Sequence, residues 1–245
     1  MNIITLNETR STLIKGLLIQ SLPPITKPQQ RVLTETIDGR DGDRLTLLGY
    51  AAYDKTVQIG LCGDYDVDEV IQYFVDNMSG KVIFSNEPDK YYRYTIVKQI
   101  DFERLLRFKQ AQVVFHVQPY KYYAGVDELG PVSLTGLTSV KVHNNGNTHS
   151  RPLWALSGTG TKSFKVNGIG VNIDFSQFDG YWCYIDVEAL EAYDGYPGTH
   201  GTALANRAVS GDYNNLRLKP GENLVSWSGS GTLSAFQVSL ISRWI

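Results

Sequence analysis

The chain has 245 residues and a net charge of −2, with 23 lysines plus arginines against 25 aspartates plus glutamates. This balance argues against a dedicated nucleic-acid binder, which shows a basic excess or stripe, and against an acidic membrane surface as partner. The length suits one large or two modest domains. Glycine (23) and tyrosine (15) are frequent. Because tyrosine fits pleated strands and glycine fits the turns between them, the composition predicts a mainly β protein.

The two cysteines and the apolar segments exclude several further classes. Cys62 and Cys183 are too few and too far apart to indicate a disulfide framework, so we expect free, buried thiols. No apolar run approaches the ~18 residues that a membrane span needs. Residues 1–10 lack the apolar core of a signal peptide. We therefore expect synthesis in a cytosol, without export by the usual route.

The first half of the sequence alternates strand and turn signals. In chain order the expected strands are 13–19, 31–37, 45–53, 55–61, 81–85, 91–99 and 111–118, with turns at 38–43 and 86–89. In the last of these strands Val113, Phe115 and Val117 fall on one face. Pro119 has no backbone donor and is expected to end that strand.

One helix is expected, over residues 67–79. Its apolar residues recur at spacings of three and four, so they form one stripe that we expect to pack on a sheet. The members of the stripe are Val67, Val70, Ile71, Phe74, Val75 and Met78. Asp66 is the expected N-cap, with Glu69 placed as in a capping box, and Gly80 is expected to end the helix in a left-handed conformation.

The composition changes after Tyr123. Residues 124–137 contain glycine, serine and proline without periodicity, which predicts a linker between domains at 1–123 and 131–245. Frequent turn signals follow, and Asn167-Gly168 is the strongest because it supplies the positive φ of a type I′ hairpin turn. Short strands at this spacing predict a β-sandwich. The other expected turns are 144–147, 194–198, 219–222 and 228–231.

Residues with reactive side chains are scattered. The four histidines are His116, His143, His149 and His200. No pair of them has a metal-ligand spacing with a carboxylate or cysteine partner. His143 and His149 flank the Asn145-Gly146 turn, so they could approach each other across a hairpin, which we interpret as a surface pair. The sequence has no nucleophile elbow and no catalytic-cysteine signature. Gly158-Thr159-Gly160 lacks the lysine and helix of a phosphate loop. We therefore expect no enzyme activity, no catalytic, cofactor-binding or metal-binding residues, and no cofactor.

Carboxylates and aromatic rings gather in the second half. The carboxylates are Asp174, Asp179, Asp186, Glu188, Glu191 and Asp194, and the aromatic residues are Trp154, Tyr181, Trp182, Tyr184, Tyr193 and Tyr196. Paired carboxylates can hydrolyse glycosides, and exposed rings with carboxylates suit a sugar-binding face. We favour a structural role, with Trp182 and Tyr184 in the core and Asp186 and Glu188 continuing towards an edge. Sugar binding is kept as an alternative.

Several short motifs together resemble the distal tail (Dit) proteins of long-tailed bacteriophages, known as siphoviruses. Each is weak alone, but their order and spacing over nearly the whole chain are more specific. They are the charged glycine turn Gly39-Arg40-Asp41-Gly42-Asp43-Arg44-Leu45, the acidic turn before tyrosines Ser85-Asn86-Glu87-Pro88-Asp89-Lys90-Tyr91-Tyr92, and the strand end from Phe115 to Tyr122. A further motif near the start of the second half is Asn144-Asn145-Gly146-Asn147 before Ser150-Arg151-Pro152-Leu153. The last motif, near the end of the second half, is Leu218-Lys219-Pro220-Gly221-Glu222-Asn223-Leu224 followed by Gly229.

The resemblance implies a structural virion protein. It implies an N-terminal, β-sandwich-like ring domain with one α-helix and a C-terminal galectin-like β-sandwich. Six chains would form a ring at the distal end of the tail, around a channel for DNA passage. The partners implied are the major tail tube protein, a tail-associated lysin or adhesin, and receptor-binding or other baseplate proteins. The chain lacks the long insertion that some members carry in the second domain. The near-neutral net charge fits a channel that passes DNA without gripping it.

Two other interpretations remain open. The C-terminal sandwich could be a carbohydrate-binding module, a glycan-binding adsorption protein or a small glycan-active enzyme. Alternatively, the chain could be a monomeric adaptor that forms no ring. The mass of the oligomer distinguishes the adaptor from the ring.

Overall fold

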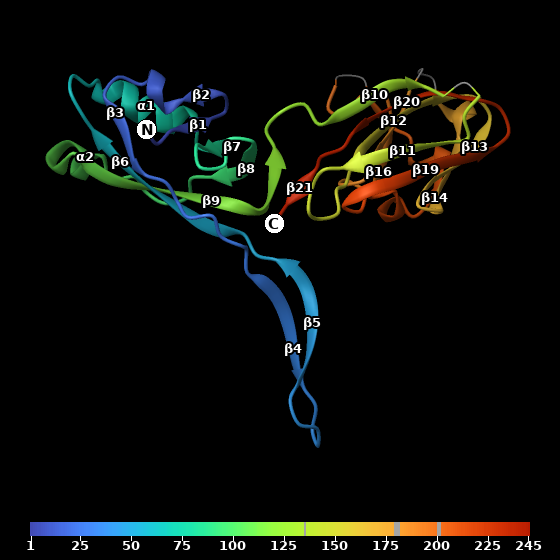
Figure 1. Cartoon of the computed structure of the whole chain (residues 1–245), viewed down its shortest axis with the longest axis horizontal. Coiled ribbons are helices and arrows are strands. Elements are labelled where there is room, and N and C mark those ends of the chain that lie inside the picture. Colours follow the sequence, from blue (N-terminus) through green and yellow to red (C-terminus); the bar gives the residue numbers. More distant parts are fainter. Residues whose placement is uncertain (135, 179–181, 200–201) are drawn as a thin grey trace. The chain divides into compact units, whose positions relative to one another are not determined.

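The computed structural model describes residues 1–134, 136–178, 182–199 and 202–245. Its contacts divide the chain into two compact units, Met1–Ala124 with Ile245, and Gly125–Trp244. Strands dominate both units, as the composition predicted (Figure 1). Each unit has its own cluster of buried apolar side chains, so each is described by itself.

The first unit is one curled antiparallel sheet with two α-helices and a separate hairpin. Its sheet has the strand order β2-β1-β7-β8-β9-β6-β3. The elements are β1 (Ile4–Leu6), β2 (Thr9–Arg10), η1 (Ser11–Leu13), β3 (Leu17–Ser21), β4 (Gln30–Thr36), β5 (Asp43–Tyr50), β6 (Tyr53–Leu61), α1 (Val67–Asp76), β7 (Ser79–Phe84), β8 (Lys90–Thr95), α2 (Phe102–Phe108) and β9 (Gln110–Tyr123).

One face of this sheet carries the core of the first unit. Val113, Phe115 and Val117 on β9 are completely buried, which confirms the predicted alternation. Phe115 packs edge-on against Phe84 of β7 and Tyr94 of β8, with ring centroids 5.9 and 5.1 Å apart. The opposite face of β6 and β9 is mainly polar and mostly exposed or half-buried, with Asp54, Thr56 and Gln112 on it. The alternation of side chains along each strand therefore separates the core from a polar outer face.

Helix α1 begins where the sequence predicted and ends earlier. The Asp66 side chain accepts from the backbone N–H groups of Asp68 and Glu69, as an N-cap does. The helix stops at Asp76 rather than at residue 79, because Ser79 already belongs to β7. Gly80 has a positive φ of 131°, but it lies within β7 and does not cap the helix.

The buried face of α1 differs from the expected stripe. Val70 and Phe74 are buried as predicted, together with Tyr73, whereas Val75 and Met78 are about half exposed. The Tyr73 hydroxyl donates to the backbone oxygen of Thr9, so a polar-tipped residue occupies the core face. The apolar pattern located the helix correctly but assigned part of its buried face wrongly.

Strand β9 continues through Pro119 to Tyr123, so the prediction that the proline ends it is wrong. The ladder with β8 shifts register between Tyr92, opposite Lys121, and Tyr94, opposite Val117. Pro119 lies within this bulge, where the ladder does not require its missing N–H group. The sequence shows the proline but not the bulge.

Several elements were not expected from the sequence, among them the short strands β1 and β2, helix α2 and strand β10. Helix α2 follows Asp101, whose side chain caps it by accepting from the backbone N–H of Arg104 at 2.8 Å. Strand β10 lies inside the segment that was expected to be an irregular linker. The family resemblance implied one helix in the first domain, and the structure has two.

The second unit is a sandwich of two antiparallel sheets. One has the order β10-β20-β12-β15-β16-β17 and the other β11-β19-β13-β14-β18. The elements are β10 (Glu128–Ser133), β11 (Ser139–Asn144), β12 (Leu153–Gly158), β13 (Thr161–Val166), β14 (Ile169–Asp174), η2 (Phe175–Gln177), β15 (Cys183–Asp186), β16 (Glu191–Asp194), β17 (Ala203–Leu204), η3 (Asn206–Ala208), β18 (Val209–Gly211), η4 (Tyr213–Leu216), β19 (Gly221–Gly229), β20 (Leu233–Ser239) and β21 (Arg243–Trp244).

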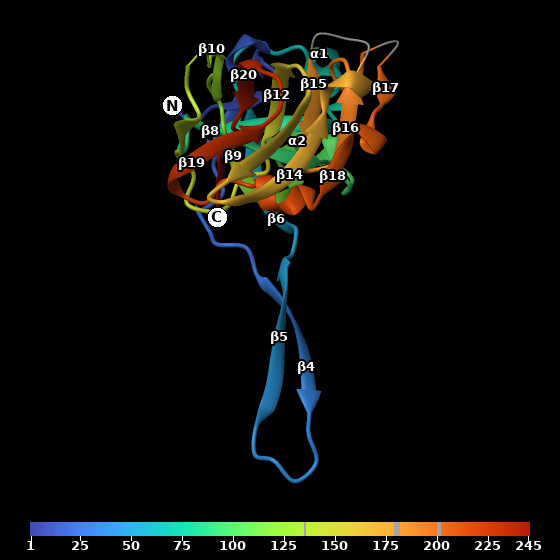
Figure 2. The same cartoon turned by 90° about the vertical axis from the view of Figure 1, so that its right-hand side faces the viewer.

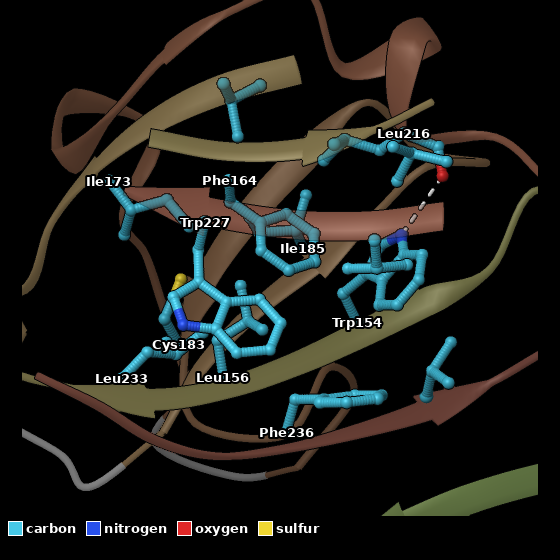
Figure 3. Close-up of a cluster of buried hydrophobic side chains, with 14 of the residues drawn as sticks. Trp154, Leu156, Phe164, Ile173, Cys183, Ile185, Leu216, Trp227, Leu233 and Phe236 are labelled. Carbon is cyan, nitrogen blue, oxygen red and sulfur yellow. Dashed lines mark hydrogen bonds between the residues drawn. The ribbon is translucent and has the colours of Figure 1, made fainter. Parts of the chain in front are cut away.

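Trp154 anchors the core between these sheets. Its ring is completely buried, and its indole N–H donates to the backbone oxygen of Leu216 at 3.1 Å (Figure 3). The ring packs edge-on against Phe164 at 5.2 Å and tilted against Phe236 at 6.2 Å. A buried tryptophan with a satisfied N–H fixes the core without an unpaired donor.

Two local predictions for this unit have opposite outcomes. Asn167 and Gly168, with φ of 52° and 89°, turn β13 into β14 as the Asn-Gly signal predicted. The expected core placement of Trp182 and Tyr184 is wrong, since both are only partly buried. The core positions on this stretch are instead Cys183, Ile185 and Val187, which carry the more consistently apolar phase of the alternation.

Candidate assembly surface

The most unusual feature of the first unit is the hairpin of β4 and β5, called the arm here and comprising residues 30–50. Its strands form a two-stranded sheet of their own, separate from the main sheet. Figure 1 and Figure 2 show the arm extending away from the strands of that sheet. Apart from Tyr50, every residue of both strands is exposed. The predicted strands and the turn between them are confirmed, but their separation from the sheet was not predicted.

The arm exposes apolar side chains that soluble proteins normally cover. Cross-strand pairing places Val32 opposite Leu47 and Thr34 opposite Leu45, so these residues share one face. Val32, Leu45 and Leu47 are 44%, 62% and 63% exposed. The full set of exposed large apolar residues on the arm is Val32, Leu33, Ile37, Leu45, Leu47 and Leu48.

An isolated two-stranded hairpin of this kind has little stability of its own in water. Two strands alone are marginally stable in water, and both outer edges of the arm present unpaired backbone groups. Its one ion pair joins Arg44 to Glu35 at 3.9 Å between exposed side chains, which contributes little. A contiguous exposed apolar surface on an unsupported hairpin indicates a protein-binding surface.

The tip of the arm is acidic. Asp38, Asp41 and Asp43 surround a single cation, Arg40. Gly39 and Gly42 have φ of 78° and 80°, which explains why the tip carries glycine at these two positions. The apolar stripe and the acidic tip together give the arm two chemically distinct zones.

The segment before the arm and the end of the arm are held to the body of the unit by two side-chain hydrogen bonds and one ring contact. The Lys55 ammonium donates to the Pro24 carbonyl at 2.8 Å, and the Asn86 side chain donates to the Pro23 carbonyl at 3.0 Å. At the other end of the hairpin, Tyr50 meets Tyr120 edge-on, with ring centroids 6.2 Å apart. Both strands of the arm are therefore held where they leave the body of the unit.

Lys55 belongs to a buried group of charges. Lys121 pairs with one oxygen of Glu87 at 2.7 Å, and the Tyr92 hydroxyl donates to the other at 2.6 Å. The Lys55 ammonium lies 4.9 Å from the centroid of the Tyr92 ring. Burial lowers the pKa of Lys55 to about 8, against the opposing attraction of Glu87. The base of the arm therefore depends on a desolvated lysine.

The polar outer face of β6 and β9 holds a second cluster. Asp54 accepts from Lys98 at 2.6 Å and contacts His116 Nδ1 at 2.9 Å. The hydrogen bonds from Lys98 and His116 lower the pKa of Asp54. A polar hollow of about 390 Å³ lies alongside, lined among others by Gln58, Gln112 and Lys98. His116 is thus engaged by a carboxylate on the neighbouring strand.

The structure separates the other predicted site residues. His143 and His149 do not face each other across a hairpin, because His143 lies in β11, which pairs with β19, and His149 lies in the loop before β12. The expectations for Asp179, Tyr181 and His200 fall outside the described residues. Within the described parts of the chain, no group of three or more His, Cys, Asp or Glu side chains could hold a metal ion.

The acidic residues near the sandwich edge have structural contacts. Asp186 accepts from the backbone N–H groups of Glu188 and Ala189, at 2.8 and 3.0 Å, and so closes a turn. Glu188 pairs with Arg243 at 3.4 Å. Both carboxylates therefore have structural partners in the structure.

Among the described residues, the aromatic side chains of the second half lie in different places. Trp154 is in the core, while Tyr184 and Tyr196 meet edge-on at 5.6 Å beside a hollow of only about 70 Å³. Tyr193 is hydrogen-bonded to Glu191, which raises the pKa of its hydroxyl to about 12. A small hollow therefore lies beside Tyr184 and Tyr196, and sugar binding by the aromatic residues stays a prediction.

Neither cysteine is in a disulfide, as predicted. Cys183 is buried, and desolvation raises the pKa of its thiol. Cys62 is exposed, contrary to the expectation that both thiols are buried. None of the helices among the described residues is long and apolar enough to span a membrane.

Comparisons with known proteins give one family match and several structures with a similar fold. Residues 9–117 match the family model of the phage tail protein RIFT-related domain. The whole chain is similar in structure to the Dit (gp 19.1) protein of phage SPP1, described as a paradigm of the hub adsorption apparatus in phages that infect Gram-positive bacteria. That similarity has a TM-score of 0.67 at 15% identity and covers 97% of both chains.

Two further solved structures share the fold at lower similarity. They are chains of the phage P2 baseplate in its activated conformation, with calcium (TM-score 0.52, 9% identity) and with strontium (TM-score 0.50, 10% identity). Each similarity covers 97% of this chain and 97% of the other. No curated protein sequence matches the chain. Residues 9–117 therefore match the phage tail protein RIFT-related domain, and the chain as a whole shares its fold with the Dit protein of SPP1, in line with the fold that the sequence motifs implied.

Proposed function

We propose that this protein is a structural component of a phage tail and forms the hub that connects the tail tube to the baseplate. Six chains form a ring at the distal end of the tail, around a channel through which DNA passes. The first unit makes the ring and the second, a galectin-like sandwich, lies outside it. The partners are further copies of the chain, the major tail tube protein, a tail-associated lysin or adhesin, and receptor-binding or other baseplate proteins.

The observation that carries this proposal is the arm. It presents unpaired strand edges and a stripe of exposed leucine and valine at the end of a fixed base. A closed ring needs heterologous contacts, in which one surface of each chain binds a different surface of the next. A projecting hairpin supplies such a surface, because it reaches beyond the body of its own unit. The fold shared with the hub protein of SPP1 supports the same role.

The alternative of a glycan hydrolase has no support in the geometry. Asp186 and Glu188 serve a turn and an ion pair. The structures that share the fold are parts of phage tails and baseplates. The proposed role therefore needs no catalytic residues.

Native mass measurement over a concentration series tests the ring. The expected result is a species of six chain masses that grows with protein concentration, and six copies in purified tail tips. A ring that assembles only on the tail would appear in the tips alone. Dimers or monomers in both preparations would refute the hexamer and favour the adaptor.

A further inference from the structure

A hollow at one end of the sandwich is not used by the proposed assembly role. Its volume is about 530 Å³, within the range of roughly 300–1,000 Å³ typical of small-molecule sites. The loops around Gly136, Gly229 and Gly231 border it. From the sequence, Gly229 and Gly231 were expected only to form part of the turn at 228–231.

A buried lysine lies in this hollow. Lys162 is on the core side of β13, two residues before Phe164, at a position where the alternation calls for an apolar side chain. It is 6% exposed, and its ammonium donates to the carbonyls of Gly229 at 3.2 Å and Gly231 at 2.7 Å. Among the described residues no carboxylate lies within ion-pair distance of it. A lysine has three donors, so a third remains for a ligand.

The surrounding backbone holds that lysine in place. A Cβ on Gly231 would lie 2.1 Å from the Thr159 carbonyl, and one on Gly229 would lie 2.4 Å from the Thr161 carbonyl. The Thr159 N–H also donates to the Thr232 carbonyl at 2.7 Å. The two loops are thus locked together with the carbonyls directed at Lys162, and the cation is fixed before any ligand arrives.

A second polar group in the same hollow has no partner. Trp227 is 8% exposed and lies beside Cys183 and Leu233 (Figure 3). Unlike the N–H of Trp154, its indole N–H donates to no described residue, and it is not among the fully enclosed unpaired atoms. Trp227 lines the hollow, and its N–H is not enclosed, so it can donate to an acceptor that enters the hollow.

The remaining lining defines the kind of ligand. Leu134, Leu137 and Leu233 supply apolar surface, and Thr138, Ser228 and Thr232 supply hydroxyl groups. Apolar walls fit the C–H faces of a sugar, hydroxyl groups match its hydroxyls, and a fixed cation without a counter-charge fits an anionic group. We propose that this hollow binds an anionic saccharide, a sugar that carries a phosphate or a carboxylate, with the acidic group on Lys162 and an oxygen acceptor on the Trp227 N–H. This inference concerns the second unit alone and does not depend on ring assembly.

The test uses the full chain with labelled tryptophan and follows the indole N–H signals by NMR. The chain has four tryptophans, and Trp227→Phe identifies the signal of interest. Glucose 6-phosphate and glucuronate should move that signal saturably, while glucose should not. The Trp154 signal, from an N–H bonded inside the core, should stay in place and report an intact fold.

Two matched pairs of variants assign the charge. Lys162→Met should weaken binding of both anionic sugars by about tenfold or more, the usual effect of losing a hydrogen bond to a charged group. Lys165→Met, an exposed lysine on the same strand, should leave binding unchanged. If Lys162→Met loses the Trp154 signal, that variant has not folded, and variants of the half-exposed Leu137 replace it in the test. Leu137→Glu should then weaken binding of the anionic sugars by charge repulsion, and Leu137→Gln should not.

Several results would overturn the proposal. One is an unmoved Trp227 signal at tens of millimolar of both anionic sugars. Inorganic phosphate binding as tightly as the sugar phosphate would indicate a plain anion site. Movement by an acidic peptide but by neither sugar would assign the hollow to a protein partner.

Discussion

The exposed leucines of the arm give a quantitative test of assembly. Changing both Leu45 and Leu47 to serine removes two side chains that are 62% and 63% exposed in the single chain. Full burial of a leucine is worth about 1.5–3 kcal/mol, so covering the exposed part is worth about 1–2 kcal/mol for each residue. The double change should therefore weaken each contact between chains by about 2–4 kcal/mol, or roughly 30- to 1,000-fold in dissociation constant.

The same change should hardly alter the fold. Substitutions of exposed residues away from the core usually shift stability by about 0.5 kcal/mol or less. Native mass measurement gives the concentration at which half the chains are assembled, and urea unfolding gives the stability. Leu13→Ser with Val97→Ser is the matched control, since these residues of the first unit are 70% and 64% exposed but lie outside the arm. Unchanged assembly of the arm variant, or equal weakening in the control, would refute the role given to the arm.

Four further predictions concern stability and activity. Phe74→Ala should lower the free energy of unfolding by about 3–5 kcal/mol in urea titrations, because the ring is completely buried, and a change within error would contradict its core role. Residues 1–124 should fold alone, with a cooperative transition by circular dichroism, since their core is self-contained; a non-cooperative fragment would count against this. Below pH 8 the Lys55 side chain is charged in both the folded and the unfolded chain. Between about pH 8 and pH 10 the unfolded chain keeps a proton that the folded chain has lost, so the free energy of unfolding should rise by about 2 kcal/mol over this range. This rise should be missing in Lys55→Met. No cell-wall polysaccharide should be hydrolysed; turnover abolished by Asp186→Asn or Glu188→Gln would disprove this.

Local patterns determined much of the secondary structure. Asp66 marked the start of α1 because its side chain can cap the first N–H groups, and Asn167-Gly168 marked a hairpin because both residues tolerate positive φ. The alternation of Val113, Phe115 and Val117 identified the core face of β9. These signals depend on a few neighbouring residues, so the sequence alone contains them. The order of weaker motifs was enough to indicate the distal tail fold.

Other features depend on contacts between distant segments. Pro119 lies inside a strand because the pairing of β8 and β9 shifts register there, which no local rule reveals. His143 and His149 form no hairpin pair because β11, which carries His143, pairs with the distant strand β19 and not with the segment that follows it. Tyr184 is outside the core because Cys183 and Ile185 take the inner face.

The two surfaces of interest were also decided by tertiary structure. The sequence predicted the strands of the arm but not that they leave the sheet, since strand signals do not specify the partner strand. Lys162 looked like any strand lysine until the fold placed its ammonium among the Gly229 and Gly231 carbonyls, 67 and 69 residues away in the chain. Burial and pairing are properties of the assembled sheets, and for that reason the surfaces that bind partners emerge only when those sheets are formed.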